Sequence, residues 1–156
     1  LGEFGHFVSC LNFNCRQAIS TKIGIRSSDD TNALLPQRLI YATKDLRNAI
    51  AHNDVVFDTR FRTGNIDKQV SNAISNATGV PGLTFETVTD YVVLIVYQLS
   101  LLRISKNDTK RLLSSFVDCT EKLRKAIPVS VYNQIILTDN NVKIAALRKF
   151  VKAKTK

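Results

Sequence analysis

Residues 39–53 read Leu-Ile-Tyr-Ala-Thr-Lys-Asp-Leu-Arg-Asn-Ala-Ile-Ala-His-Asn, and this stretch predicts both a helix and a functional site. Its apolar residues recur at steps of three and four, which is the spacing of one face of an α-helix. Pro36 suits the first turn of such a helix, because its missing N–H would have no partner there. The pattern predicts a helix over about residues 35–52. The apolar positions are Leu39, Ala42, Leu46, Ala49 and Ile50.

The polar residues of this stretch do not all share one face. Asp45, Asn48 and His52 are spaced by three and four residues, so a helix places them on the same side. Arg47 lies about 140° from His52 around an ideal helix. A single straight helix therefore cannot direct the side chains of Arg47 and His52 at one small target.

Three arrangements would bring the arginine and the histidine to one target. The helix ends or bulges near Ala51, or Arg47 reaches round on its long side chain, or a second copy of the chain completes the site. Asn53 and Asp54 follow directly, and both residue types suit caps and turns. They favour a helix end at this point.

The side chains at the end of the stretch suit RNA cleavage without a metal. His52 could act as general base or acid. Arg47 offers a planar set of donors to a phosphate that gains charge in the transition state. Asn48 could orient the imidazole or donate to a phosphate oxygen, and Asp45 could orient His52. The attacking group would be the 2′-hydroxyl of the RNA. A structural interpretation stays open, with Arg47 paired to an acid and His52 near the negative end of the helix dipole.

The segment Leu-Arg-Asn-Ala-Ile-Ala-His-Asn at 46–53 resembles the signature of the HEPN ribonuclease superfamily, an arginine followed after four to six residues by a histidine. Phe-Gly-His-Phe at 4–7 and Val-Val-Phe-Asp-Thr-Arg-Phe at 55–61 flank it. Together they are similar to the Abi-like abortive-infection family of bacteria. The resemblance covers about residues 4–61. The family often has a second polar residue such as histidine after the motif histidine, where this chain has Asn53.

This resemblance implies an all-α, HEPN-like bundle of about six helices, with residues 1–156 forming one domain. Because the family usually has helices before the Phe-Gly step, the chain is expected to lack some N-terminal helices. The resemblance also implies a homodimer in which the two Arg/His motifs face each other, and a role in phage defence by toxin-like cleavage of host RNA. An antitoxin protein or RNA would then be a further partner.

Length and composition allow this interpretation. A chain of 156 residues suits one domain with one core. Its 44% hydrophobic and 22% charged residues are typical of globular proteins, not of disordered ones. The net charge of +9 favours RNA or another polyanionic partner, although many soluble proteins are simply basic.

The cysteines indicate a cytoplasmic protein without a metal centre. Cys10, Cys15 and Cys119 are odd in number and lack metal-ligand spacing, so we expect reduced, largely buried thiols. With two histidines and no carboxylate cluster, the sequence predicts neither a metal site nor a cofactor. There is no signal peptide or lipidation motif. The apolar run at 91–97 is too short to span a membrane.

Further helices are predicted on both sides of the central one. Gly79 and Pro81 stop a helix, Thr84 caps the next, and Pro128 ends another. The helix with the apolar run is expected to be buried, at the centre or at a dimer interface. Residues 54–64 are expected to be an extended connector. The predicted helices are about 6–22, 65–77, 84–105, 108–127, a short one at 131–136, and 142–151.

Basic residues outside the central helix are further candidates for RNA contact. Arg60 and Arg62 follow the motif closely and could bind RNA phosphates or form salt bridges with Asp54 or Asp58. The basic tail at 148–156 could contact the RNA backbone or remain solvated. His6 is expected to be an incidental cap or surface residue.

Two other functions remain open. One is a non-catalytic HEPN module that binds RNA or a partner protein. The other is a structural interaction domain without nucleic acid, which predicts that positive charge is scattered evenly. Clustering of Arg47, Arg60, Arg62 and the tail on one face would count against the latter.

Overall fold

The computed structural model describes residues 1–25, 30–52, 56 and 66–154. Within these ranges every regular element is an α-helix, so the all-α prediction is confirmed, with eight helices instead of about six. The helices are α1 (Gly2–Cys10), α2 (Phe13–Ile23), α3 (Leu35–Ala51), α4 (Lys68–Thr78), α5 (Val88–Leu101), α6 (Lys106–Ala126), α7 (Val129–Ile136) and α8 (Asn140–Ala153).

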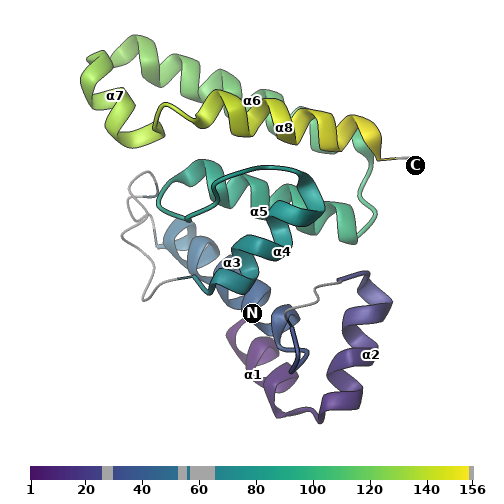
Figure 1. The fold of residues 1–156 in the computed structure, drawn as a ribbon. Coiled ribbons are helices and arrows are strands. Elements are labelled where there is room, and N and C mark those ends of the chain that lie inside the picture. The colour runs from purple at the N-terminus through teal and green to yellow at the C-terminus, as the bar shows by residue number, and fades with distance from the viewer. Residues whose placement is uncertain (26–29, 53–55, 57–65, 155–156) are drawn as a thin grey trace.

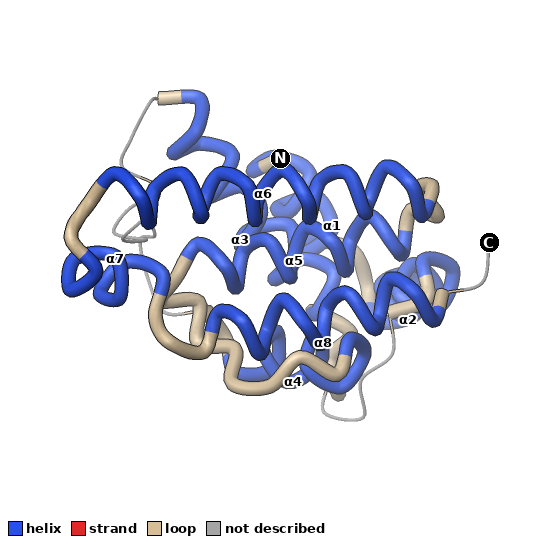
Figure 2. The backbone as a smooth tube through the Cα atoms, turned by 90° about the horizontal axis from the view of Figure 1, so that it is seen from above, coloured by secondary structure: helices blue, strands red, loops and turns tan. Residues whose placement is uncertain are grey.

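The helices are arranged around α5 (Figure 1). Helices α6, α7 and α8 lie on one side of it, and α3 and α4 lie on the other. Helices α1 and α2 pack against α3 at the far end of the molecule. Seen from above, α6 and α8 run side by side over α5 (Figure 2).

Helix α5 forms the centre of the core, as its apolar run predicts. Tyr91, Val93, Leu94 and Val96 have no exposed surface. A helix that is apolar all round needs neighbours on every side, and α5 contacts α3, α4, α6 and α8. None of the helices in the described ranges combines the length and apolar character that a membrane span requires.

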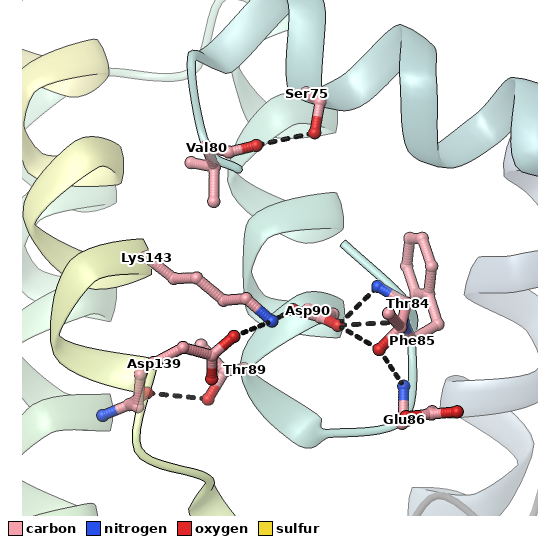
Figure 3. A network of polar contacts seen from close by, with 10 residues as sticks. Ser75, Val80, Thr84, Phe85, Glu86, Thr89, Asp90, Asp139 and Lys143 are labelled. Atoms are coloured by element: carbon pink, nitrogen blue, oxygen red, sulfur yellow. Dashed lines mark hydrogen bonds and ion pairs between the residues drawn. The ribbon is translucent and has the colours of Figure 1, made fainter. Parts of the chain in front are cut away.

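The start of α5 differs from the prediction, because the helix begins at Val88 and not after Thr84. One carboxylate oxygen of Asp90 accepts hydrogen bonds from the backbone N–H groups of Thr84 (3.0 Å) and Phe85 (2.9 Å), as Figure 3 shows. The backbone of Phe85 has a φ of 61°, which a residue with a side chain rarely adopts. These bonds hold residues 84–85 in a tight loop, so Thr84 cannot cap the helix.

The other oxygen of Asp90 joins α5 to α8. It accepts a hydrogen bond of 2.7 Å from Nζ of Lys143, which also lies 2.9 Å from an oxygen of Asp139 (Figure 3). Beside this pair, the hydroxyl of Thr89 donates to the side-chain oxygen of Asn140 at 2.8 Å. Asp90 and the Lys143 side chain are buried, so both charges are compensated inside the protein. We call Asp90, Lys143 and Asp139 the buried charge network.

The predicted helix over residues 6–22 was wrong as one element, because the chain forms two helices that meet at residues 11–12. The side chain of Asn12 caps α2 by accepting a hydrogen bond from the backbone N–H of Cys15 at 2.9 Å. Arg16 then donates to the carbonyl oxygen of Leu11 at 2.5 Å. The Asn12 cap starts a new helix at a point where hydrophobic periodicity alone predicts one continuous helix.

Several other helix ends agree with the sequence. Pro36 lies in the first turn of α3, Gly79 ends α4 in the left-handed conformation with φ 71°, and Pro128 separates α6 from α7. Helices α6 and α8 each begin two residues earlier than predicted. The predicted extended connector 54–64 lies outside the described residues, apart from residue 56.

The prediction of buried cysteines was wrong. Cys10, Cys15 and Cys119 are free and exposed. Helix α6 lies at the surface and buries only one stripe, which includes Leu113 and Thr120, whereas Cys119 falls on its outer face. The other two cysteines belong to α1 and α2, which only α3 covers closely.

Candidate functional site

The candidate site lies at the C-terminal end of α3. The helix ends at Ala51, and His52 follows as the C-cap with φ −94° and ψ 5°. The backbone N–H of His52 still donates to the carbonyl oxygen of Asn48 at 2.9 Å. One of the three predicted arrangements, a helix that ends near Ala51, is therefore present.

Arg47 and Asn48 are brought together by their side chains. Nη1 of Arg47 donates a hydrogen bond of 3.1 Å to the side-chain oxygen of Asn48. Arg47 is exposed and Asn48 is half-buried. The guanidinium of Arg47 therefore lies toward the side of the helix that carries Asn48.

His52 is exposed to solvent. Among the described residues, none forms a hydrogen bond or an ion pair with its imidazole ring. His52 stands at the point where the helix has just ended. An exposed imidazole of this kind is open to an external ligand, but its orientation is not set by a described neighbour.

Asp45 contacts Lys44 in place of the histidine that it was predicted to orient. Its carboxylate lies 4.0 Å from Nζ of Lys44, and no hydrogen bond joins it to His52 within the described residues. Burial raises the pKa of Asp45 above its usual value, and the positive charge of Lys44 offsets part of that effect. Asp45 therefore lies beside Lys44, and its role toward His52 stays a prediction.

Lys44 is a candidate that the sequence analysis does not single out. It precedes Arg47 and Asn48 by three and four residues, so the three side chains share a face of α3. Its side chain is 33% exposed, and its ammonium lies 5.4 Å from the centre of the Tyr41 ring. The spacing alone could have identified Lys44 as a second cation beside the motif.

Helix α1 packs on the face of α3 that points away from the core. A Cβ atom at Gly5 would lie 3.2 Å from the ring of Tyr41, and one at Gly2 would lie 3.5 Å from the side chain of Lys44. The order of these contacts shows that α1 runs antiparallel to α3. The absent side chains of the two glycines allow α1 to lie close beside the residues that lead to the motif.

Large apolar side chains are exposed on α1 and near the end of α3. Phe4 and Phe7 of α1 are 55% and 57% exposed, and Ile50 of α3 is 62% exposed. His6, between the two phenylalanines, is also exposed, and Sγ of Cys10 lies 3.7 Å from its Nε2. Apolar side chains on an outer face are typical of surfaces that another protein chain covers.

Some of the residues predicted to contact RNA are not among those that the structure describes. Arg60 and Arg62 lie outside the described residues, as do the last two residues of the tail. Within the described part of the chain, no group of three or more histidine, cysteine or acidic side chains could hold a metal ion. The site as described consists of Lys44, Arg47, Asn48 and His52.

Comparison with models of known families, with curated protein sequences and with solved structures found no match to this chain. The resemblance to the Abi-like family therefore rests on the residues quoted from the sequence.

Proposed function

We propose that the protein is a metal-independent endoribonuclease of the abortive-infection or toxin type that acts in the cytoplasm. The proposal rests chiefly on one observation, the hydrogen bond between Arg47 and Asn48 on the exposed end of the helix that is capped by His52. These side chains combine a phosphate-binding group with an imidazole that can accept and donate a proton. The net charge of +9 supports an RNA substrate.

In the proposed reaction, the 2′-hydroxyl of the RNA attacks the adjacent phosphorus. The proton of that hydroxyl passes to a neutral imidazole of His52, and the bond between phosphorus and the 5′-oxygen breaks. A protonated imidazole returns a proton to the leaving oxygen. The products are a 2′,3′-cyclic phosphate and a 5′-hydroxyl. Arg47 stabilises the charge that accumulates on the phosphate, and Asn48 holds the guanidinium in place.

A homodimer would supply both imidazoles. One His52 would act as base and that of a second copy as acid, with two copies of Arg47 at the same phosphate. The exposed Phe4, Phe7 and Ile50 support an interface close to the motif, since they offer apolar surface for a second copy to cover.

The second candidate is a module that binds RNA or a protein without cleaving RNA. The exposed His52 ring favours it, because no described side chain orients the imidazole. A general base works best when its ring is held in hydrogen-bonding reach of the proton that it removes. An antitoxin, if present, would bind the same exposed surface in either case.

The test is cleavage of labelled single-stranded RNA in EDTA by the wild type, His52→Ala and His6→Ala. The chain has two histidines, both exposed, so His6→Ala is a matched control. The proposal predicts cleavage by the wild type and the control, and a loss of at least about a hundredfold in His52→Ala. Equal cleavage by all three proteins would contradict the role of His52. Salt-sensitive RNA binding without cleavage by any of them would favour the binding module.

A mixing experiment tests the dimer separately. Arg47→Ala and His52→Ala are each expected to be inactive. In a mixed dimer of the wild type and His52→Ala, only one of the two imidazoles remains. If the site needs both, an excess of His52→Ala that exchanges subunits with the wild type lowers the activity of the wild-type copies, whereas a site contained in one copy leaves that activity unchanged.

A further inference from the structure

A second cationic site lies between the end of α5, the start of α6 and the end of α8. These segments enclose a hollow of about 790 Å³. Arg103, Lys106 and Lys154 line it, and no acidic residue in the described part of the chain does so. No residue of α3 contributes to the lining, so the hollow is distinct from the candidate ribonuclease site.

Arg103 and Lys106 are held in defined positions around the hollow. Arg103 lies in the turn after α5 with a φ of 57°, a conformation that an L-residue rarely adopts and that is enriched at binding sites. Lys106 donates to the carbonyl oxygens of Lys152 (2.5 Å) and Lys154 (3.2 Å). These bonds join the start of α6 to the end of α8 and hold the two sides of the hollow together.

Lys154 contributes a cation that is partly removed from water. Its ammonium lies 4.9 Å from the centre of the Phe150 ring. Burial lowers the pKa of Lys154 below its usual value, because water no longer solvates the ammonium fully. A bound anion would compensate this charge. The ammonium of Lys154 and the guanidinium of Arg103 have no acidic partner among the described residues.

Asp108, which is close in sequence to the lining residues, is already paired. One carboxylate oxygen of Asp108 lies 2.6 Å from the hydroxyl of Ser105, and the other lies 3.8 Å from Arg111. Asp108 does not line the hollow. The positive charge of the hollow is therefore not cancelled at the positions where an anion would bind.

The walls between the cations combine apolar side chains with the polar residues Ser100, Ser105, Asn107 and Thr109. Val96, Ile104, Phe150 and Val151 contribute the apolar side chains. Pockets for small ligands typically have volumes of about 300–1,000 Å³, apolar walls and a few polar groups that fix the ligand. A flat apolar group with phosphate attached matches these walls and cations, and a nucleotide has this chemistry.

We propose that this hollow binds a phosphorylated nucleotide unit, with its phosphate on Arg103 and Lys154 and its base against the apolar wall. The unit could be a free nucleotide or one residue of an RNA strand. Both share the chemistry that the hollow recognises. The proposal does not depend on cleavage at α3.

Titration calorimetry with ATP tests the proposal, with adenosine as the uncharged probe. Arg103→Asn removes the charge and keeps a residue that tolerates the left-handed backbone. Lys154→Gln removes the second charge. Arg111→Gln is the matched control, because Arg111 is an exposed arginine on α6 that does not line the hollow. The residues that change are all exposed, and thermal unfolding verifies that each variant is folded.

We expect ATP to bind more tightly than adenosine, and each hollow variant to weaken ATP binding by about tenfold or more. Arg111→Gln should leave binding within about twofold of the wild type. Absence of ATP binding together with absence of any RNA binding that depends on Arg103 would overturn the proposal. An equal loss in Arg111→Gln and Arg103→Asn would also overturn it, since binding would then follow general surface charge.

Competition identifies the source of the nucleotide. A short single-stranded RNA that displaces labelled ATP, with a displacement that Arg103→Asn weakens, would assign the hollow to a strand as well. ATP binding that RNA cannot compete would assign it to a free nucleotide. RNA binding that depends on Arg103 while ATP does not bind would assign it to a strand alone.

Discussion

The buried charge network and the end of α3 use the same kinds of side chain in opposite ways. In the network, Asp90 and Lys143 are 0% and 2% exposed, and each charge is met by partners within the protein. At the end of α3, Arg47 and His52 are exposed, and the one bond between motif side chains joins Arg47 to Asn48. The charges of Asp90 and Lys143 are thus compensated inside the protein, whereas the motif side chains are open to solvent and to a ligand.

The buried charge network stabilises the fold, whereas the end of α3 is free to contact another molecule. Asp90 connects the loop at residues 84–85, helix α5 and helix α8, so its loss would affect three segments at once. Removing a motif side chain would leave no buried group without a partner. The first region should therefore govern the free energy of unfolding, and the second should govern activity.

The largest effect on stability is expected from Asp90→Ala. It leaves the Lys143 ammonium buried with only Asp139 as its acidic partner and removes the acceptor for two backbone N–H groups. Breaking a buried ion pair in this way costs about 3–5 kcal/mol. Urea unfolding measures the loss, with Asp118→Ala as an exposed control that should change the free energy of unfolding by less than about 0.5 kcal/mol. Equal values for the two variants would show that the network does not hold the fold.

A smaller loss is expected from Gly5→Val in α1. Its Cβ would lie 3.2 Å from the Tyr41 ring and 3.3 Å from the Ile40 side chain, and the added methyl groups would extend toward them. Overpacking of this kind costs about 1–3 kcal/mol. Gly2→Val is the comparison, because its nearest neighbour, Lys44, is at an ordinary 3.5 Å. If urea unfolding shows the Gly2 variant to be the less stable one, the close packing of α1 on α3 is not as described.

The pH dependence of stability tests the state of Lys143. Burial lowers the pKa of Lys143, but hydrogen bonds and the charges of Asp90 and Asp139 raise it by more, so it lies above the usual 10.5. The folded protein thus holds this proton more tightly than the unfolded chain. The stabilisation is complete below about pH 10.5 and is lost as the pH rises through the folded pKa.

Urea unfolding between pH 8 and pH 11 is the measurement, and Lys143→Met should lose less stability across the top of that range than the wild type. Burial also raises the pKa of Tyr97 above 10.0, so Tyr97 likewise makes the free energy of unfolding fall as the pH rises. Tyr97→Phe serves to separate this contribution. Parallel profiles for the wild type and Lys143→Met would contradict the assigned pairing.

The smallest effect on stability is expected at the motif. Arg47→Ala and His52→Ala change exposed side chains, so each should alter the free energy of unfolding by less than about 0.5 kcal/mol. Both should nevertheless lose cleavage of RNA. A loss of stability similar to that of Asp90→Ala would show that the motif supports the fold, and would remove the contrast between the two regions.

Much of the fold follows from local sequence signals. Pro36, Gly79 and Pro128 mark helix ends correctly because proline and glycine restrict or free the backbone where they stand. The start of α5 cannot be predicted from local signals. It depends on the side chain of Asp90, which bonds to residues 84–85 and is itself held by Lys143, 53 residues away. Periodicity carries no information about such a distant pair.

The candidate site shows the same division. Side-chain spacing predicts that Asn48 faces the side of His52, and the helix end near Ala51 follows from the residues after it. The bend of Arg47 toward Asn48 does not follow, because it depends on the rotamer of a long side chain. Asp45 was assigned to the imidazole from spacing alone, and its burial beside Lys44 could not be foreseen. The backbone of Arg103 likewise has no sequence signal.

The most direct test of the ribonuclease proposal uses an RNA in which one residue lacks the 2′-hydroxyl. Cleavage of the unmodified RNA by the wild type in EDTA first identifies a preferred bond and the end groups of the products. Replacing the 2′-hydroxyl at that bond with hydrogen should abolish cleavage there and leave cleavage at other bonds unaffected. Cleavage at the unmodified bonds should yield 2′,3′-cyclic phosphate ends. Continued cleavage at the modified bond would contradict the account, because water and not the RNA would then be the attacking group.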